Sequence, residues 1–237
     1  MCIRDSAPAF ASLRAMAAQA LGGSALEQAL GALEQQVQAA SSKQAGKAEP
    51  AQPPKGAARR LQLLAEIERR LLHEEGAQVE AAQPAVERVL GVTLAVATGP
   101  ILRRQLARCY AVLYERGARA SMYAVTGNLL NQLGAKGQAA GAASPVARAA
   151  MAQVLGAVCE AHGAAMPSIA REAVLCLLKV IKATSAPADA PVRLAALEAL
   201  RGALVGAGAR AITSAAQADA AKACLLYTSD AADEEDS

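Results

Sequence analysis

The sequence predicts an all-α protein, an α-solenoid built of two-helix repeats. One amphipathic segment occurs three times, beginning at Pro100, Pro145 and Pro191. In each copy the large apolar residues recur every three or four positions, the spacing of a helix with one wide buried face. The prolines lie 45 (145−100) and 46 (191−145) residues apart. That period is the one expected for stacked HEAT or armadillo-type helix pairs.

Aligning the three segments on their prolines places similar side chains at the same positions. Two aligned positions carry large apolar residues, and we expect these to face the core. A third position carries only small residues, which would let neighbouring helices approach each other. The aligned sets are Leu106, Met151 and Leu197; Leu113, Val158 and Leu204; and Ala111, Gly156 and Gly202.

Both ends of the chain are interpreted as sequencing-adapter artefacts. Met1–Asp5 and Cys224–Thr228 can be encoded by DNA strings that are reverse complements of each other. A library with one adapter joined to both ends produces that relation, whereas protein termini have no reason to show it. We therefore assign residues 1–6 and 224–237 to the adapter and leave them out of the fold prediction. On this interpretation the chain is a window from a longer protein.

Charge and cysteine content favour a cytosolic protein without a membrane span. Leaving out the ends removes one basic and six acidic residues, so the formal charge rises from +3 to +8. The basic residues are spread over several helices, which is typical of solvated faces. Cys109, Cys159 and Cys176 remain, without C-x-x-C spacing. The odd count argues against a disulfide framework, and no apolar run approaches the roughly 20 residues of a membrane span.

The body of the chain divides into three parts. Residues 7–40 form a partial helical segment, for which Ser24 is a predicted N-cap. Residues 41–56 contain no large apolar side chain. Such a stretch cannot offset the entropy cost of ordering its backbone, so we expect a disordered linker there. The repeat array is expected over residues 57–223 as about four helix pairs. The stripe of the first part is Leu26, Leu30, Leu33 and Val37.

Capping residues and periodicity together predict the helices of the array. Pro100 suits a first helical turn, because its missing N–H has no partner to lose there. Ser144 suits the N-cap of the helix that starts at Pro145. Gly117 suits a left-handed residue at a helix end, and Gly76 is expected to close the first helix in the same way. The first helix has the stripe Leu61, Leu64, Ile67, Leu71 and Leu72, and the expected helices are Ala57–Glu75, Pro84–Ala97, Pro100–Ala118, Ala120–Leu133, Pro145–Gly163, Met166–Thr184, Pro191–Ala207 and Ala209–Ala223.

One cysteine–histidine pair has a spacing that is compatible with metal binding. Cys159 and His162 are three residues apart on a predicted helix, a spacing that could supply half of a metal site. The sequence offers no second pair, and Cys159 aligns with the core-facing Tyr114. A core cysteine beside a helix-end histidine is therefore the favoured interpretation. His73 lies beside Glu74 and Glu75 and is expected to be solvated at a helix end.

A glycine-rich loop was considered as a phosphate site. Gly134, Gly137 and Gly141 surround Lys136. No strand precedes them and the G-K-[ST] element is missing, so a flexible connector is the favoured interpretation.

Four arginines could form a basic ridge for phosphates: Arg103, Arg104, Arg108 and Arg116. Both tyrosines of that helix lie on its buried stripe, so no aromatic platform is available to stack bases. We predict no nucleic-acid partner. We also predict that the chain is not an enzyme and has no catalytic, cofactor-binding or metal-binding residues and no cofactor.

The order and content of three segments resemble the N-terminal HEAT repeats of the HEAT-repeat-containing protein five family, whose relatives include yeast Laa and plant SWEETIE. The segments are Leu106–Ala118, Pro145–Gly163 and Met166–Lys182. The resemblance extends over about Ala57–Ala223, and it departs from the family in its Ala/Gly-rich substitutions and its linker.

This resemblance implies a non-catalytic scaffold in clathrin-adaptor-dependent traffic between endosomes and the Golgi. It implies protein partners, including the clathrin adaptor complex and its accessory subunits. It also implies a cytoplasmic location, peripheral to the trans-Golgi network and endosomes.

Two other functions stay open from the sequence. The chain could be a different HEAT-repeat scaffold, for nuclear transport or for a phosphatase or kinase. A nuclear-transport receptor would be expected to present acidic inner faces, whereas this body is basic. The array could also be the regulatory arm of a larger enzyme.

The repeat alignment predicts that Leu106→Asp or Leu197→Asp unfolds the array, because either change would bury an unpaired charge. Circular dichroism and thermal melting test this expectation. Full helicity and unchanged melting for both variants would contradict the alignment.

Overall fold

A computed structural model describes residues 25–44, 56–134, 143–184, 186 and 189–208, and every element within them is helical. The predicted all-α class is therefore confirmed. Short 3₁₀ turns, η2 (Leu94–Val96) and η3 (Gly163–Ala165), follow two of the helices. The α-helices are α2 (Ala25–Gln44), α3 (Ala57–His73), α4 (Gly76–Thr93), α5 (Pro100–Arg116), α6 (Ala120–Gly134), α7 (Pro145–His162), α8 (Pro167–Ala183) and α9 (Ala190–Ala207).

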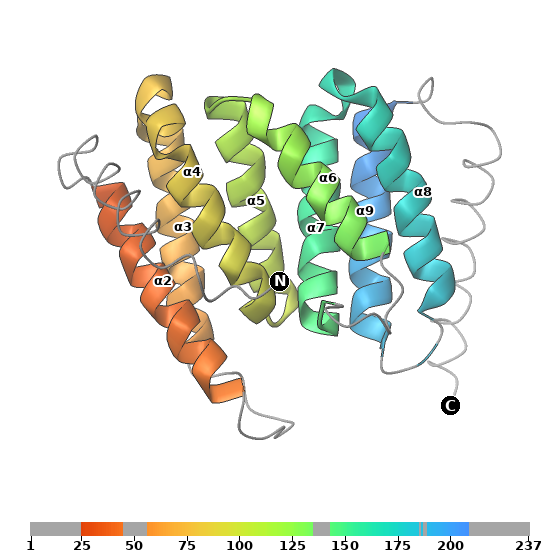
Figure 1. Ribbon diagram of the computed structural model, residues 1–237, viewed down its shortest axis with the longest axis horizontal. Coiled ribbons are helices and arrows are strands. Elements are labelled where there is room, and N and C mark those ends of the chain that lie inside the picture. The colour runs from red at the N-terminus through yellow and green to blue at the C-terminus, as the bar shows by residue number, and fades with distance from the viewer. Residues whose placement is uncertain (1–24, 45–55, 135–142, 185, 187–188, 209–237) are drawn as a thin grey trace, which may run out of the picture.

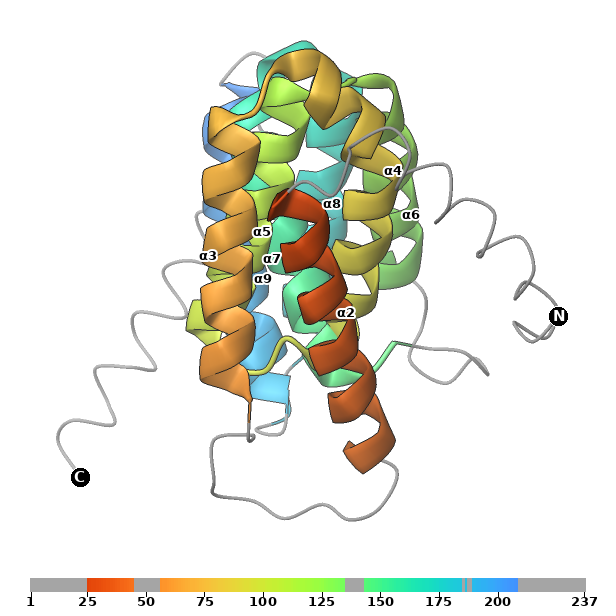
Figure 2. The same ribbon diagram turned by 90° about the vertical axis from the view of Figure 1, so that its left-hand side faces the viewer.

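The helices form two layers (Figures 1 and 2). Helices α3, α5, α7 and α9 lie side by side and make the first layer, in which each helix packs against the next. Helices α4, α6 and α8 make the second layer. Each second-layer helix packs against the first-layer helix that follows it in the chain: α4 on α5, α6 on α7, and α8 on α9. This stacking of helix pairs is the architecture of an α-solenoid.

Helix α2 belongs to this array, contrary to the prediction of a segment separated from it by a linker. It packs against α3 and α4 at the end of the array (Figure 2), and Arg88 Nη1 of α4 lies 3.7 Å from Glu34 Oε1 of α2. The predicted stripe of α2 is buried in the common core. The helix also runs to Gln44, past the predicted boundary at residue 41. The Ser41 hydroxyl donates to the Val37 carbonyl (3.1 Å), which accommodates it in the last turns.

Several predicted features lie outside the described residues. These are the adapter segments, the first part of residues 7–40, most of the linker, and the helix expected at Ala209–Ala223.

The core runs continuously between the layers. Leu64, Ile67, Leu106 and Leu113 are fully buried, and burial of each such side chain contributes about 1.5–3 kcal/mol. The tyrosines of α5 pack there as well: the ring centroids of Tyr110 and Tyr114 are 6.2 Å apart. Leu72, predicted to face inward, is 47% exposed. It follows the buried Leu71 directly and lies at the edge of the apolar stripe of α3, so its side chain stays half outside the core.

Helix α4 starts earlier than predicted. Gly76 does not close α3, which ends at His73, but is the first residue of α4. Pro84 therefore lies inside the helix rather than at its start. A proline there removes one main-chain hydrogen bond, and the helix continues because Val79 and Val86, on either side of it, are fully buried.

The repeat spacing is uniform once α9 is placed correctly. Helix α9 begins at Ala190, so Pro191 is its second residue, whereas Pro100 and Pro145 are first residues. Alignment on the prolines therefore shifts α9 by one position. Leu197 is only half-buried and is not part of the core, which corrects its predicted place, whereas the half-buried Leu204 packs against the core as expected. With a spacing of 45 the buried sets are Leu106, Met151 and Ala196, and Tyr110, Leu155 and Leu200.

The predicted caps are partly confirmed. Pro100 opens α5, and the Ser144 side chain accepts a hydrogen bond from the Ala147 N–H (3.2 Å). Gly117, however, has a φ of −101° and is not left-handed. A side chain is excluded there for another reason: a Cβ would lie 3.2 Å from Cδ of Gln83. The Gln83 amide occupies this space because it clamps the turn, accepting from the Ala118 N–H (2.7 Å) and donating to the Ala118 carbonyl (2.8 Å).

The corrected register changes the expectation for the aspartate variants. Leu106→Asp and Leu200→Asp should each cost about 3–5 kcal/mol, because both side chains are fully buried. Leu197→Asp should cost less than about 1.5 kcal/mol, because Leu197 is half-buried. Denaturant unfolding measures the three values. Equal losses for Leu197→Asp and Leu200→Asp would contradict the register.

Candidate functional site

A groove of about 410 Å³ crosses three consecutive helices of the first layer. Helix α5 borders it on one side, α9 on the other, and α7 forms its floor. Charged side chains from all three helices line it. The lining residues are Arg104, Ala107 and Arg108 of α5; Gln153, Gly156, Ala157 and Glu160 of α7; and Glu198, Ala199 and Arg201 of α9.

Small residues create this groove. A Cβ on Gly156 would overlap the backbone of Ala199, and a Cβ on Gly202 would lie 2.7 Å from the Gly156 carbonyl oxygen. Helices α7 and α9 therefore touch backbone to backbone. Gly156 and Ala157 have no side chain or a very short one. Side chains of α5 and α9 can therefore contact each other over the surface of α7.

The ion pair between Arg104 and Glu198 makes that connection. Arg104 Nη2 lies 2.5 Å from Glu198 Oε1, although 94 residues separate the two in the chain. Gln153 Nε2 of α7 donates to the other carboxylate oxygen (2.6 Å). Partial burial of Glu198 acts to raise its pKa, but the hydrogen bonds from Arg104 and Gln153 outweigh it and hold the pKa below its usual range.

A second, looser pair lies along the same groove. Arg201 Nη2 is 3.3 Å from Glu160 Oε1, and both side chains are exposed. An exposed pair of this kind contributes about 0–1 kcal/mol. Arg108 also lines the groove and is exposed, and it has no ion pair or hydrogen bond with any described residue. Its guanidinium is therefore available to an incoming carboxylate or carbonyl group.

The predicted arginine ridge is not a single surface. Arg104 and Arg108 share the groove, but Arg103 is buried. Arg116 lies at the far end of α5, where Nη2 donates to the Glu74 carbonyl (2.9 Å). The arginines therefore have different roles within one helix.

Cys159 is a core residue and His162 is the last residue of α7, as the favoured interpretation predicted, and His162 is buried as well. Nε2 of His162 donates to the Ala111 carbonyl (3.0 Å), which ties the end of α7 to α5. Burial raises the pKa of the Cys159 thiol to about 12, so the thiol stays protonated at neutral pH. His73 is exposed at the end of α3, as expected. Lys136, Gly137 and Gly141 lie outside the described residues.

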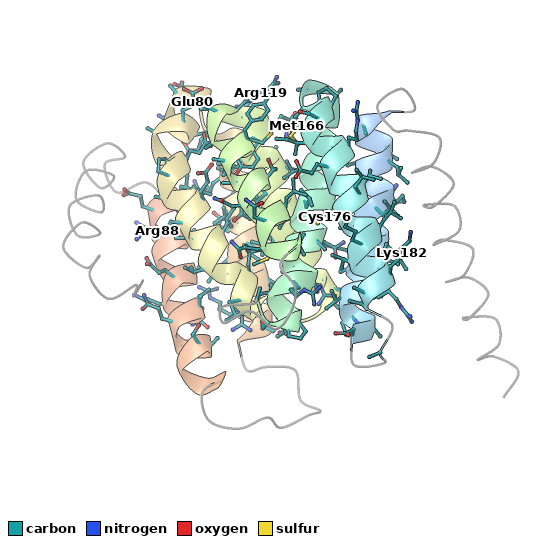
Figure 3. All side chains as sticks on the ribbon, turned by 45° about the vertical axis from the view of Figure 1, so that its right-hand side comes forward. Glu80, Arg88, Arg119, Met166, Cys176 and Lys182 are labelled. Atoms are coloured by element: carbon teal, nitrogen blue, oxygen red, sulfur yellow. The ribbon has the colours of Figure 1, made fainter. Side chains whose placement is uncertain are left out.

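The other two cysteines are also core residues. The Cys109 thiol faces the Leu64 carbonyl (3.3 Å). Cys176 lies on α8 (Figure 3), and its thiol faces the Leu130 carbonyl (3.8 Å). Burial raises the pKa of both thiols. In the part of the chain that the structure describes, no three His, Cys, Asp or Glu side chains gather as a metal site would require.

Sequence reasoning missed the groove as a site. The usable signal was the alignment of Gly156 with other small residues, which predicted close helix approach but not the charged side chains above it.

Comparison of the chain with protein-family models, curated proteins and solved structures gives no match. Among the described helices, none combines the length and apolar character needed to cross a membrane.

The floor of the groove can be tested with two glycine substitutions. Gly156→Ala should destabilise the fold by about 1–3 kcal/mol, because the added methyl group forces α7 away from α9. Gly127→Ala in α6 is the matched control, since a Cβ there meets nothing within 4 Å. The control should stabilise the fold by about 0.5–1 kcal/mol through helix propensity. Denaturant unfolding measures both, and equal stabilisation by the two would contradict the described contact.

Proposed function

We propose that the chain is a non-catalytic, protein-binding scaffold of HEAT-type helical repeats. The observation that carries this proposal is the groove over α5, α7 and α9, which is assembled from three consecutive repeats. Repeat arrays bind partners on extended surfaces of this kind, to which each repeat contributes a few side chains.

The groove suits a peptide segment of a partner protein. Its walls carry both guanidinium and carboxylate groups, and Arg108 is free to accept a new contact. Neighbouring helices are about 8–10 Å apart, a distance spanned by about three residues of an extended chain. A segment running across the helices would meet one repeat every three residues.

The more specific proposal concerns vesicle traffic. It rests on the resemblance of Leu106–Ala118, Pro145–Gly163 and Met166–Lys182 to the HEAT-repeat-containing protein five family. On this proposal the partners are the trans-Golgi clathrin adaptor complex and its accessory subunits. The chain would act in the cytoplasm, at the surface of the trans-Golgi network and endosomes.

Biolayer interferometry tests both the general proposal of a protein-binding scaffold and the specific proposal of a role in vesicle traffic. The whole chain is immobilised and exposed to purified trans-Golgi clathrin adaptor complex, and saturable binding is expected. Arg108→Glu should weaken that binding about 10-fold, because it reverses the free charge in the groove. The matched control is Arg119→Glu, which changes an exposed arginine at the edge of the array beyond α5 (Figure 3).

The possible outcomes distinguish the scaffold proposal from the traffic proposal. Absence of adaptor binding would overturn the traffic proposal. Saturable binding of a phosphatase catalytic subunit or a basic nuclear-import peptide in its place, sensitive to Arg108→Glu, would support the scaffold with a different partner. Equal effects of Arg108→Glu and Arg119→Glu would overturn the groove as the binding surface.

A further inference from the structure

Four arginines occupy the same position in the four first-layer helices. Each is the fourth residue of its helix, counted from Ala57, Pro100, Pro145 and Ala190. The four helices run in the same direction, so their N-terminal ends lie along one edge of the array, the lower edge in Figure 1. We call these residues the arginine row: Arg60, Arg103, Arg148 and Arg193.

No side chain of the arginine row forms an ion pair or a hydrogen bond with any residue that the structure describes. The Nε atoms of Arg60, Arg103 and Arg148 are buried and lack a partner, and the Thr98 hydroxyl in the turn before α5 shares this condition. Arg60 is 2% exposed and Arg103 is 6% exposed. Unpaired polar atoms are thus concentrated at this edge.

Helix geometry directs the side chains of the row toward the edge. In a helix the Cα–Cβ bond is tilted toward the N-terminus, so long side chains extend back over the preceding turn. Arg60 follows this rule: its Nη1 is 3.6 Å from the place where a Cβ on Gly56, the residue before α3, would lie.

The electrostatics of this edge favour an anion. The first-turn N–H groups of a helix lack intrahelical partners, and the helix dipole adds a partial positive charge at the same end. The guanidinium groups add charge of the same sign. Burial lowers the pKa of Arg60 and Arg103, which reflects the cost of holding these cations without a counterion. The Glu198 carboxylate acts on Arg103 but is already bonded to Arg104 and Gln153.

We propose that the arginine row binds an extended acidic segment of a partner protein, with one carboxylate on each guanidinium. This inference rests on the proposed function as a protein-binding scaffold. Arginine and carboxylate match in geometry and can form two parallel hydrogen bonds. Because adjacent helices are about 8–10 Å apart, a segment in the extended polyproline II conformation with an acidic residue at every third position presents its carboxylates on one face. Their repeat of about 9 Å matches the row.

The recessed position of the row favours a peptide over other anions. A membrane surface is broad and flat and does not reach side chains that are 2% and 6% exposed, whereas a single Asp or Glu side chain can. Single-stranded nucleic acid would need aromatic side chains for base stacking. The tyrosines of α5, Tyr110 and Tyr114, are instead buried in the core.

Fluorescence anisotropy with the whole chain tests the proposal. The probe is a labelled 13-residue peptide of Glu-Ser-Gly repeats, compared with a peptide in which every Glu is Gln. We expect binding of the acidic peptide only. The double variant Arg103→Gln/Arg148→Gln should weaken binding about 10-fold for each arginine removed. The control Arg69→Gln/Arg119→Gln changes the net charge equally at two exposed sites outside the row and should leave binding unchanged.

A second double variant distinguishes loss of binding from loss of folding. Arg103→Lys/Arg148→Lys keeps the charge but removes the two-bond geometry, and it should give intermediate affinity with unchanged circular dichroism. Equal affinity of the row variant and its control would overturn the proposal. So would tighter binding to phosphatidylserine vesicles or to oligo-uridine of equal charge. Adaptor binding without acidic-peptide binding would overturn the arginine row alone, and the reverse result would overturn the adaptor as partner while supporting the row.

Discussion

Contact between neighbouring first-layer helices is the interaction on which the rest of this structure depends. A single helix of this length buries too little apolar surface to offset the entropy of ordering it. Each of α5 and α7 therefore packs a neighbour on both sides and a second-layer helix as well. The core is one continuous cluster built from many moderate contributions, such as those of Leu106 and Leu155.

The two surfaces described above follow from the same geometry. Small residues bring α7 against α9 and leave a groove over α7, and Arg104 contacts Glu198 across this groove. Where first-layer helices start side by side, a residue repeated at the fourth position becomes a row along one edge. Arg60 and Arg103 are 43 residues apart in the chain (103−60) yet lie at equivalent places. A repeat sequence thus places like charges together without any local cluster in the sequence.

Periodicity was sufficient to predict the fold class, the helices from α5 to α9, and most buried positions. It failed where the same residue type, proline, is compatible with more than one position in a helix. Pro191 is the second residue of α9 rather than the first, so alignment on the prolines shifted the register of α9 by one residue. Pro84 lies inside α4, so placing the start of α4 at this proline gave the wrong boundary. The groove was beyond prediction because Arg104 and Glu198 become neighbours only after three repeats have stacked. No local pattern records the pairing of residues two repeats apart.

The backbone contact between α7 and α9 also has a mechanical consequence. Two helices whose interface is filled by long side chains can slide past each other, because the side-chain rotamers adjust as the helices shift. At Gly156 and Gly202, α7 and α9 meet through backbone atoms, and packed backbones resist shear because close contacts cannot be exchanged gradually. Under bending load, α7 and α9 should move as one stiff body. The seam between α3 and α5, where Leu64 and Cys109 meet, should yield first and act as the elastic joint of the array.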